Sequence, residues 1–415
     1  MTPSVMGARE GAEREEAFTT IQRERNVLAV LEAVRPGGAL SRLDIARETG
    51  LSKPTVAAAL QLLESGGVVK PVGFASGGRG PKASLYTVEA RSILVLGLAI
   101  GSRFLRATVA DLQGTTRFEE DIPLAVPDLP NLLDAVGSVR ERIRTVSGTL
   151  RLAVAGVPGV VDAESGIVRS VPNITGLEGR NIAHLLSERL GLPTLAENDV
   201  NLAAIGEREF GQGLTTDTYA YVLLGTGVGA GIVLNGELYR GSRGAAGEVG
   251  FLPIGADPFA LAAGTHSGAL ERRLSGDAIV AHARALAATV PTELAEPYTT
   301  PQLFDAARRG DPLGRAVTDY AAREIALVVA TLGVVLDVGL VMLGGGIGSR
   351  SEFLLGAVRE FLSQLMPWPP TVTIASLGDG SIRLGAVARG LDAAVLGVVR
   401  ELVAADAESS RESAG

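Results

Sequence analysis

Residues 219–236 read YAYVLLGTGVGAGIVLNG. The apolar run from Tyr219 to Leu224 predicts a strand, the glycine-rich segment after it predicts a turn, and Ile232 to Leu234 predicts a return strand that ends at Asn235-Gly236, a type I′ pair. Glycine loops of this kind also occur in dinucleotide-binding domains, but there a helix must follow the loop. Because a strand follows here, the segment predicts a β-hairpin and not a Rossmann fold.

A second hairpin of the same design lies earlier in the chain. Ile93 to Ile100 predicts a strand, Gly101-Ser102-Arg103 a tight turn, and Phe104 to Leu112 a return strand. The two turns lie 124 positions apart, counted from Gly101 to Gly225. Two hairpins with glycine turns, each opening a segment of mixed helices and strands, indicate an internal duplication and an α/β fold.

The first ninety residues follow a different pattern, which begins with two helices. Apolar residues at helical spacing predict a first helix over Phe18–Val34, which ends at Pro36-Gly37-Gly38. Ser41, with Asp44 three positions later, has the form of a capping box for a second, short helix. Thr49-Gly50 then forces a turn.

A third helix and a hairpin complete this module. Ser52 is the expected N-cap of the helix, and Pro54 occupies its first turn, where a missing N–H costs nothing. Two helices around a glycine-containing turn have helix-turn-helix spacing. Residues 68–72 and 84–88 predict two short strands that enclose the glycine-rich segment 73–82, which has the form of a wing.

In a winged helix-turn-helix, the third helix enters the major groove of DNA. Between Leu40 and Tyr86 there are six basic and three acidic side chains, a local positive excess. The alternative is a winged helix that is used for protein contacts. We expect DNA contacts from the start and the exposed face of the third helix and from two basic residues of the wing: Ser52, Lys53, Thr55, Gln61, Arg79 and Lys82.

Composition narrows the class of protein. The 415 residues include 46% hydrophobic and 20% charged side chains, which is ordinary for a soluble globular protein. The sequence has no cysteine and three histidines, so we expect no disulfide and no metal site. The net charge of −8 divides unevenly, as +1 over residues 1–90 and −9 over the remainder, so any affinity for nucleic acid should reside in the first part.

Two segments bear on localisation. The N-terminus is rich in charged residues and has no apolar stretch behind them, so it does not have the form of a signal peptide. Residues 325–343 are apolar enough to raise the question of a membrane span. The glycines at 344–346 favour a buried helix that ends near Leu336 and a short strand over 339–343. We therefore expect a cytoplasmic protein without a membrane segment.

Six blocks follow one another in the chain: Val157-Pro158-Gly159-Val160-Val161-Asp162, Val171-Pro172-Asn173, Glu197-Asn198-Asp199-Val200-Asn201, Leu224-Gly225-Thr226-Gly227, Gly244-Ala245-Ala246-Gly247-Glu248-Val249-Gly250 and Leu343-Gly344-Gly345-Gly346-Ile347. Their order resembles the ROK family (repressors, open reading frames, kinases) in its winged-helix regulator branch, from about Leu40 to Ala394. The resemblance implies an actin-like, RNase H-like fold of two lobes, with a sugar in the cleft and, in the kinases, ATP beside it.

These patterns together divide the chain into four parts. We expect a mobile N-terminal tail at 1–17, a winged helix-turn-helix at 18–90, a two-lobed sugar-kinase-like domain at 91–405 and a flexible C-terminal tail at 406–415.

The polar residues of the blocks are candidates for a binding site. Asp199 follows a strand expected at 192–196 and precedes a helix expected from Asn201, which places its carboxylate at a strand end, where α/β folds bind ligands. By resemblance it is the base of the kinase reaction, vestigial here, and it would bind an effector together with Asn173, Asn198 and Glu248. The alternatives are an N-cap for Asp199, a solvated loop carboxylate for Glu248 and a turn residue for Asn173.

Departures from the family pattern favour loss of catalysis. Where the kinases carry an aspartate, two glycines and a threonine, the first hairpin has Ala99, Gly101, Ser102 and Arg103. Losing the aspartate removes the carboxylate that would organise Mg²⁺, and phosphoryl transfer depends almost wholly on such positioning. Phe251 replaces the histidine of the family's zinc site. We expect no catalytic residue, no metal, no cofactor, and only remnants of the nucleotide loops: Gly101, Gly225, Thr226, Gly227, Gly344 and Gly345.

The sequence thus predicts a transcriptional regulator, with repression as the expected mode, whose silent kinase-like domain senses a sugar or sugar-phosphate effector. The expected partners are double-stranded operator DNA and further copies of the chain, as a homodimer or homotetramer. Two alternatives stay open. One is an active ATP-dependent hexose kinase with a DNA-binding appendage, favoured by Asp199 and the intact Gly225 loop. The other is an effector-independent DNA-binding scaffold, favoured by Phe251.

Overall fold

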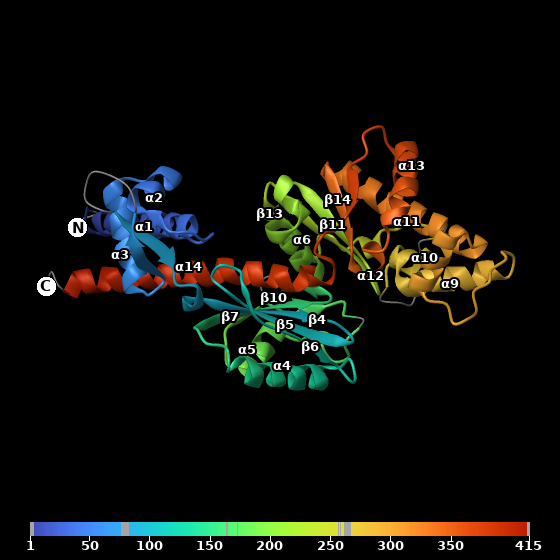
Figure 1. Cartoon of the computed structure of the whole chain (residues 1–415), viewed down its shortest axis with the longest axis horizontal. Helices are drawn as coiled ribbons and strands as arrows, with labels where there is room; N and C mark the ends of the chain where they lie inside the picture. Colours follow the sequence, from blue (N-terminus) through green and yellow to red (C-terminus); the bar gives the residue numbers. More distant parts are fainter. Residues whose placement is uncertain are drawn as a thin grey trace.

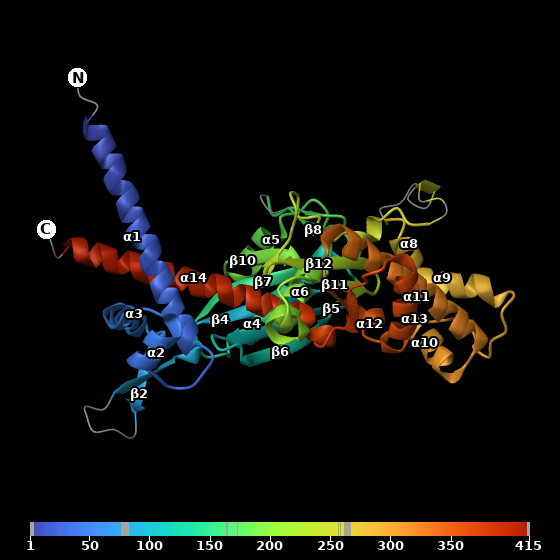
Figure 2. The same cartoon turned by 90° about the horizontal axis from the view of Figure 1, so that it is seen from above.

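The computed structural model describes residues 4–75, 83–162, 165–171, 173–255, 257, 259–260 and 267–412. A winged helix-turn-helix lies at one end of an elongated molecule, a first α/β lobe in the middle and a second α/β lobe at the other end (Figure 1). One long helix, α14 (Ser381–Glu412), runs from the second lobe past the first lobe to the N-terminal module. Seen from above, α1 and α14 cross and both chain ends project at the side of this module (Figure 2).

The N-terminal module has the three expected helices and the two expected strands, and it has a further short strand, β1, that was not predicted. They are α1 (Ser4–Val34), β1 (Leu40–Ser41), α2 (Arg42–Thr49), α3 (Lys53–Ser65), β2 (Val69–Phe74) and β3 (Ser84–Val88), and the strands form an antiparallel sheet in the order β1-β3-β2. Both predicted N-caps are confirmed. Ser41 and Asp44 form a capping box on α2, and the Ser52 side chain accepts a hydrogen bond from the Thr55 N–H at the start of α3.

The first lobe is built on a five-stranded sheet in the order β10-β7-β4-β5-β6. Its buried face packs against the helices α4 (Leu129–Ile143) and α5 (Ile182–Leu190). A small hairpin, β8 (Val160–Val161) with β9 (Val168–Arg169), precedes α5. The sheet consists of β4 (Leu94–Ile100), β5 (Phe104–Asp111), β6 (Thr116–Pro123), β7 (Leu150–Val157) and β10 (Thr194–Asn198).

The second lobe repeats this topology. Its sheet has the order β13-β12-β11-β14-β15, so each lobe places an antiparallel run of three strands beside two parallel ones, as an internal duplication predicts. The strands are β11 (Tyr219–Leu224), β12 (Val228–Leu234), β13 (Glu237–Leu238), β14 (Leu340–Gly344) and β15 (Thr371–Ile374). The helices are α8 (Glu271–Leu274), α9 (Gly276–Ala287), α10 (Thr300–Arg309), α11 (Pro312–Leu336), α12 (Gly345–Gly348) and α13 (Leu355–Leu365).

Both predicted hairpins are confirmed. β4 pairs with β5 around residues 101–103, and β11 pairs with β12 around residues 225–227. Asn235 and Gly236 have positive φ angles of 53° and 78°, as a type I′ turn requires. The segment that raised the question of a membrane span contains the end of α11 and the strand β14, as predicted, and none of the helices that the structure describes is both long and apolar enough to cross a bilayer.

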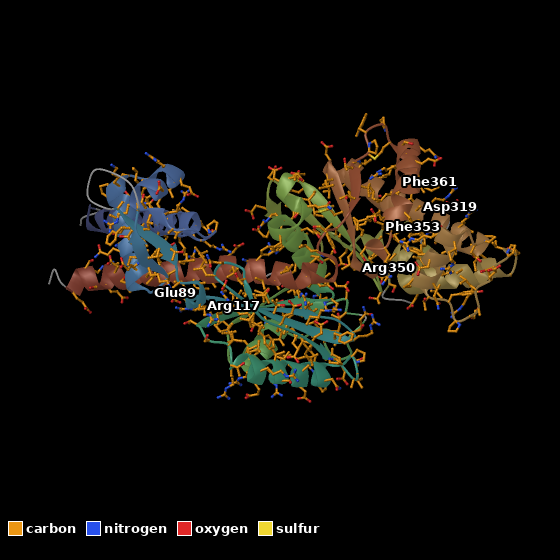
Figure 3. All side chains as sticks on the ribbon, viewed as in Figure 1. Glu89, Arg117, Asp319, Arg350, Phe353 and Phe361 are labelled. Carbon is orange, nitrogen blue, oxygen red and sulfur yellow. The ribbon has the colours of Figure 1, made fainter. Side chains whose placement is uncertain are left out.

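Charged side chains fix the edges of these units. Glu89, which follows β3, forms an ion pair with Lys70 of β2 at the junction between the module and the first lobe (Figure 3). Asp111, fully buried at the end of β5, accepts hydrogen bonds from the backbone N–H groups of residues 113 and 115 and pairs with Arg117 of β6. A buried carboxylate with all these partners holds the β5–β6 turn.

Two helices lie between the sheets of the two lobes. The first half of α14 packs on β4 and β7, and α6 (Asp199–Phe210) packs between α14 and the strands β11 and β12. Glycines allow the two helices to touch through their backbones. A Cβ atom at Gly385 would lie 1.7 Å from the Leu202 carbonyl oxygen, and one at Gly206 would lie 2.3 Å from the Ser381 carbonyl oxygen. This seam, the backbone contact of α6 with α14 at Gly206 and Gly385, therefore fixes the distance between the two helices.

The second half of α14 belongs to the core of the N-terminal module. Val395, Val398, Val399 and Val403 are at most 4% exposed and share one hydrophobic cluster with α1, α3 and β3. Ion pairs join Arg23 to Asp406 and Glu24 to Arg400 at the α1–α14 crossing.

The structure thus differs from the expected domain boundaries at both ends of the chain. α1 begins at Ser4, inside the segment expected as a tail, and α14 continues to Glu412. Residues 395–403, which the sequence placed in the sugar-kinase-like domain, complete the core of the winged helix instead.

Candidate functional site

A cleft between the two lobes brings all four expected effector residues together. The first lobe contributes Asn173, Asn198 and Asp199, and the second contributes Glu248. Thr226, Gly227 and Phe251 also line the cleft, as does Glu271, which the sequence had not suggested.

Asp199 is the first residue of α6, at the end of β10, as expected for a ligand site at a strand end. One of its carboxylate oxygens, Oδ1, accepts the N–H of Val200 at 2.9 Å. Burial, with a smaller contribution from the nearby carboxylate of Glu248, raises the pKa of Asp199 to about 7, although backbone hydrogen bonds act in the opposite direction. The group is therefore able to change its charge near neutral pH.

Asn198 has the capping role that we had considered for Asp199. Its Oδ1 accepts the N–H of Asn201 at 3.0 Å, which makes it the N-cap of α6, and its Nδ2 donates to the Gly159 carbonyl at 3.0 Å. The alternative interpretation of Asp199 as an N-cap is therefore wrong by one residue. The helix also begins at Asp199 and not at Asn201, because the cap lies three residues before the N–H that it binds.

Glu248 lies in the cleft because the loop before it is pressed against β12. Gly247 has a φ of 88°, and a Cβ there would lie 1.8 Å from the Ala230 carbonyl oxygen. The Ala230 N–H donates to the Gly247 carbonyl at 2.7 Å. Burial, and then the carboxylate of Glu271, raises the pKa of Glu248. Glu248 is therefore a partly buried residue of the cleft and not the solvated loop carboxylate that was the alternative interpretation.

Glu271, at the start of α8, is the third carboxylate of the cleft, and burial raises its pKa. Its oxygens lie beside the turn of the second hairpin: a Cβ at Gly227 or at Gly250 would lie 3.4 Å from one of them. No motif in the sequence marked this residue. The one available signal was a carboxylate directly after Gly268-Ala269-Leu270, at the first position of a short helix.

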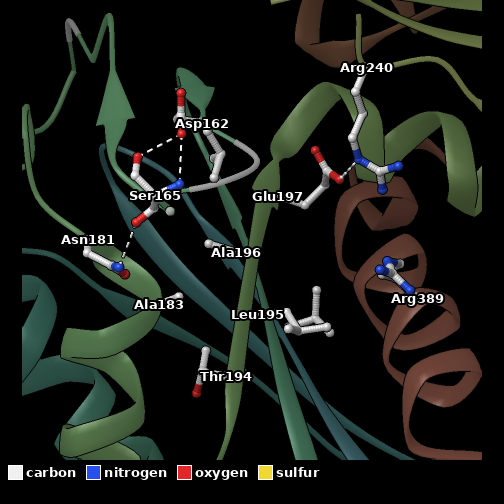
Figure 4. A pocket seen from close by; sticks show the side chains of 13 residues that line it. Asp162, Ser165, Asn181, Ala183, Thr194, Leu195, Ala196, Glu197, Arg240 and Arg389 are labelled. Carbon is white, nitrogen blue, oxygen red and sulfur yellow. Dashed lines mark hydrogen bonds and ion pairs between the residues drawn. The ribbon is translucent and has the colours of Figure 1, made fainter. Parts of the chain in front are cut away.

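An inter-lobe ion pair supports the cleft from behind. Glu197, nearly buried on β10, accepts the N–H of Asn198 at 3.0 Å and the Nδ2 of Asn201 at 2.9 Å through Oε1. Its Oε2 accepts the Nε of Arg240, which follows β13, at 2.7 Å (Figure 4). The pair therefore fixes the segment that carries Asn198 and Asp199 against the segment that leads to Glu248.

The nucleotide-loop remnants are only partly brought together. Thr226 and Gly227 line the cleft, and the Gly225 N–H closes its own turn by donating to the Gly227 carbonyl at 3.0 Å. Gly344 is the last residue of β14, which pairs with β11, and Gly345 begins α12, whereas Gly101 lies in the turn of the first hairpin. In the described part of the chain, no three histidine, aspartate or glutamate side chains are arranged to hold a metal ion.

The expected DNA-binding residues at the N-cap of α3 and along α3 are at least partly accessible. Ser52, Lys53 and Gln61 are exposed and Thr55 is half-buried. The Ser52 and Thr55 hydroxyls lie 2.8 Å apart, so each has a local partner. Lys53 and Gln61, eight residues apart, lie on one face of the helix. Arg79 and Lys82 lie outside the described residues.

Replacing Asp199 with asparagine should stabilise the protein at alkaline pH. Because folding raises the pKa of this carboxyl from 3.8 to about 7, the native state loses stability as pH rises between those values, and the loss is complete above them. We expect Asp199→Asn to add about 2 kcal/mol at pH 8 and little at pH 4, measured by urea unfolding. Asp319, an exposed residue of α11 (Figure 3), is the control, and Asp319→Asn should show no such pH dependence. Equal effects at both pH values would contradict the assignment.

Comparison with protein families identifies both parts of the chain. The model of the ROK family matches residues 95–391. The chain belongs to the ROK family. The model of the IclR helix-turn-helix domain matches residues 25–73. This ROK protein is therefore a DNA-binding transcriptional regulator in its architecture, and the second half of α14 lies beyond both matched regions.

Its relatives include repressors and kinases. It is 27% identical to the xylose repressor of Caldicellulosiruptor bescii over 389 residues, which cover 89% of this chain and 96% of the relative. It is 30% identical to the glucokinase of Streptomyces coelicolor over 311 residues, which cover 71% of this chain and 96% of the relative.

Solved structures give the same picture of the fold. A ROK family transcriptional regulator, described as a homologue of the Escherichia coli MLC protein, superimposes with a TM-score of 0.79 over 92% of this chain and 98% of its own, at 22% identity. A ROK glucokinase of Streptomyces griseus in complex with glucose and AMPPNP gives a TM-score of 0.62 over 72% of this chain and 99% of its own, at 26% identity.

Proposed function

We propose that this ROK regulator represses transcription by binding an operator through α3, and that a carbohydrate bound between the lobes changes its affinity for DNA. The observation that carries the proposal is the path from cleft to module. Asp199 begins α6, α6 touches α14 through backbone at Gly206 and Gly385, and α14 completes the core of the winged helix.

The chemistry of the cleft supports a polyhydroxylated effector. Carboxylates and amides from both lobes can accept and donate hydrogen bonds, and Glu197 with Arg240 holds their segments together. The repressor relative named for xylose and the glucokinase solved with glucose are consistent with a sugar. Because a ligand shifts an equilibrium only by its differential affinity, the effector must prefer one lobe arrangement and DNA the other. A coupling of about 1–3 kcal/mol is the usual size.

We further propose that the domain does not transfer phosphate. Ala99, at the end of β4, offers no carboxylate for Mg²⁺, and Arg103 places a long side chain in the first turn. A coupled assay with ATP and common hexoses should show no sugar phosphate formation. Turnover at about 1–100 per second would establish the kinase alternative. The glucokinase relatives and the intact Gly225 turn are the observations that favour that alternative.

Operator binding through α3 is tested by charge removal. Lys53→Ala should weaken binding to a palindromic fragment from the promoter region by about 1–3 kcal/mol if Lys53 contacts a base, or reduce the salt dependence if it contacts a phosphate. Arg309, an exposed residue of α10 in the far lobe, is the matched control, and Arg309→Ala should bind as the unaltered chain does. Titrations by fluorescence anisotropy at several salt concentrations give both quantities. Equal binding by Lys53→Ala and the control would exclude α3 as the reading element.

A further inference from the structure

The described side chains that line the cleft carry negative charge that no basic side chain among them balances. Among its described lining residues, Asp199, Glu248 and Glu271 are acidic, and no lysine, arginine or histidine is present. Arg240, which precedes the Glu248 loop, lines a different cavity and is paired there with Glu197 (Figure 4). An effector that carries a phosphate or carboxylate group would meet three acids without a counterion, which is unfavourable at this degree of burial.

An aromatic face completes the acidic side of the cleft. Phe251 lines the cleft and is 48% exposed, and its N–H donates to the Glu248 carbonyl at 3.1 Å. The segment that leads to Glu271 packs directly on it, because a Cβ at Gly268 would lie 2.4 Å from the Phe251 Cα. Phe251 therefore lines the cleft together with Glu248 and Glu271, and its backbone contacts the segments that carry both of them. A benzene ring cannot donate or accept the hydrogen bonds of a sugar hydroxyl, but its face attracts a cation.

We propose that the effector is a cationic amino sugar, whose ammonium group lies on the Phe251 side of the cleft, near Glu248 and Glu271, while Asp199 and Asn198 bind its hydroxyl groups. The inference rests on the proposed effector function of the same cleft and names its chemical class. An ammonium group has three N–H donors and so suits two carboxylates and a ring face, whereas the hydroxyl of a neutral hexose at that place would gain no attraction from the ring.

The raised pKa values of the three acids give this proposal a distinct pH dependence. Asp199, on α6, titrates near neutral pH, and the pKa values of Glu248, before the short 3₁₀ turn 249–251, and Glu271, on α8, are raised as well. A cation stabilises the ionised carboxylates, so it binds more tightly as pH rises and it displaces protons. A neutral sugar, which can bond to either form of a carboxyl group, has no such preference.

The first experiment compares matched sugars on the full chain by titration calorimetry. The probes are glucosamine, galactosamine and mannosamine, each with its parent hexose, its N-acetyl form and its 6-phosphate. We expect one amine to bind at least 10-fold more tightly than its three counterparts at pH 7, and to weaken several-fold at pH 5.5 with proton release in buffers of different ionisation enthalpy. Tighter binding of a neutral sugar or of a sugar phosphate would contradict the amino-sugar proposal. It would not contradict the proposed effector function of the cleft. If no sugar binds, or if the cleft binds Mg²⁺ or Ca²⁺ instead, the effector function itself fails.

Variants then locate the ammonium group. Glu271→Gln should lower the ratio of amine to parent hexose affinity about 10-fold while leaving the parent hexose within a few-fold, and Phe251→Leu, which keeps an apolar side chain, should lower the ratio about 2- to 5-fold. Glu237→Gln, at an exposed position of β13 in the same lobe, is the control. Thermal unfolding of each variant shows whether it is folded. A ratio that is unchanged in both folded cleft variants would place the amine elsewhere.

Discussion

Replacing Val399 with aspartate should abolish operator binding, although the residue lies more than 300 positions after α3, the proposed DNA-contacting helix. Val399 is fully buried in the cluster that α14 shares with α1 and α3. An unpaired carboxylate at this place costs about 4 kcal/mol or more, enough to release α14 from the winged helix or to unfold that module. Anisotropy titration with operator DNA measures the loss, and circular dichroism measures how much helix is lost with it.

Val335 provides the matched control for this substitution. It is 72% exposed near the end of α11, so Val335→Asp should change stability by less than about 1 kcal/mol and leave DNA binding intact. Normal operator binding by Val399→Asp would show that the winged helix folds and acts without α14.

The second large effect is expected from a single added methyl group at the α6–α14 seam. In Gly385→Ala, the new Cβ would overlap the Leu202 carbonyl oxygen at 1.7 Å, so the two helices must separate. We expect a loss of about 3 kcal/mol or more in the free energy of unfolding, because backbone atoms cannot move aside as side chains do. Chemical denaturation measures the change, and the coupling between effector and operator should weaken with it.

Gly397, on the same helix, separates the steric effect from helix propensity. No heavy atom lies within 4 Å of the position that its Cβ would occupy. Gly397→Ala should therefore stabilise the protein by about 0.5–1 kcal/mol, since alanine is the better helix former. A similar response of both variants would mean that α6 and α14 are not held in close contact.

Features fixed by local chemistry were predictable from the sequence. The caps at Ser41 and Ser52 and the turn at Asn235-Gly236 depend on a few neighbouring residues, and the structure confirms them. At the start of α6, local chemistry alone does not identify the N-cap residue. Asn198 and Asp199 are both good N-cap residues, and only the tertiary contact of Asn198 with Gly159 decides between them.

Features made by distant segments were not predictable in this way. Glu271 enters the cleft because the segment after Gly268 packs on Phe251, and nothing around it in the sequence marks it as a ligand residue. Glu197 and Arg240 belong to different lobes and become partners only when the lobes assemble. The role of α14 was missed for the same reason: a stripe of valines at helical spacing shows that a face is buried, but it does not show which domain covers it.

The shared helix has a consequence for how the protein is made. The ribosome synthesises α3 more than 300 residues before the valines that close the core of the same module, which lie in the second half of α14. A chain that is cut short by a premature stop or by proteolysis before α14 therefore carries a winged helix with an open core. We therefore expect operator binding only from chains that have been synthesised through α14, so that shorter products would not compete with the regulated form.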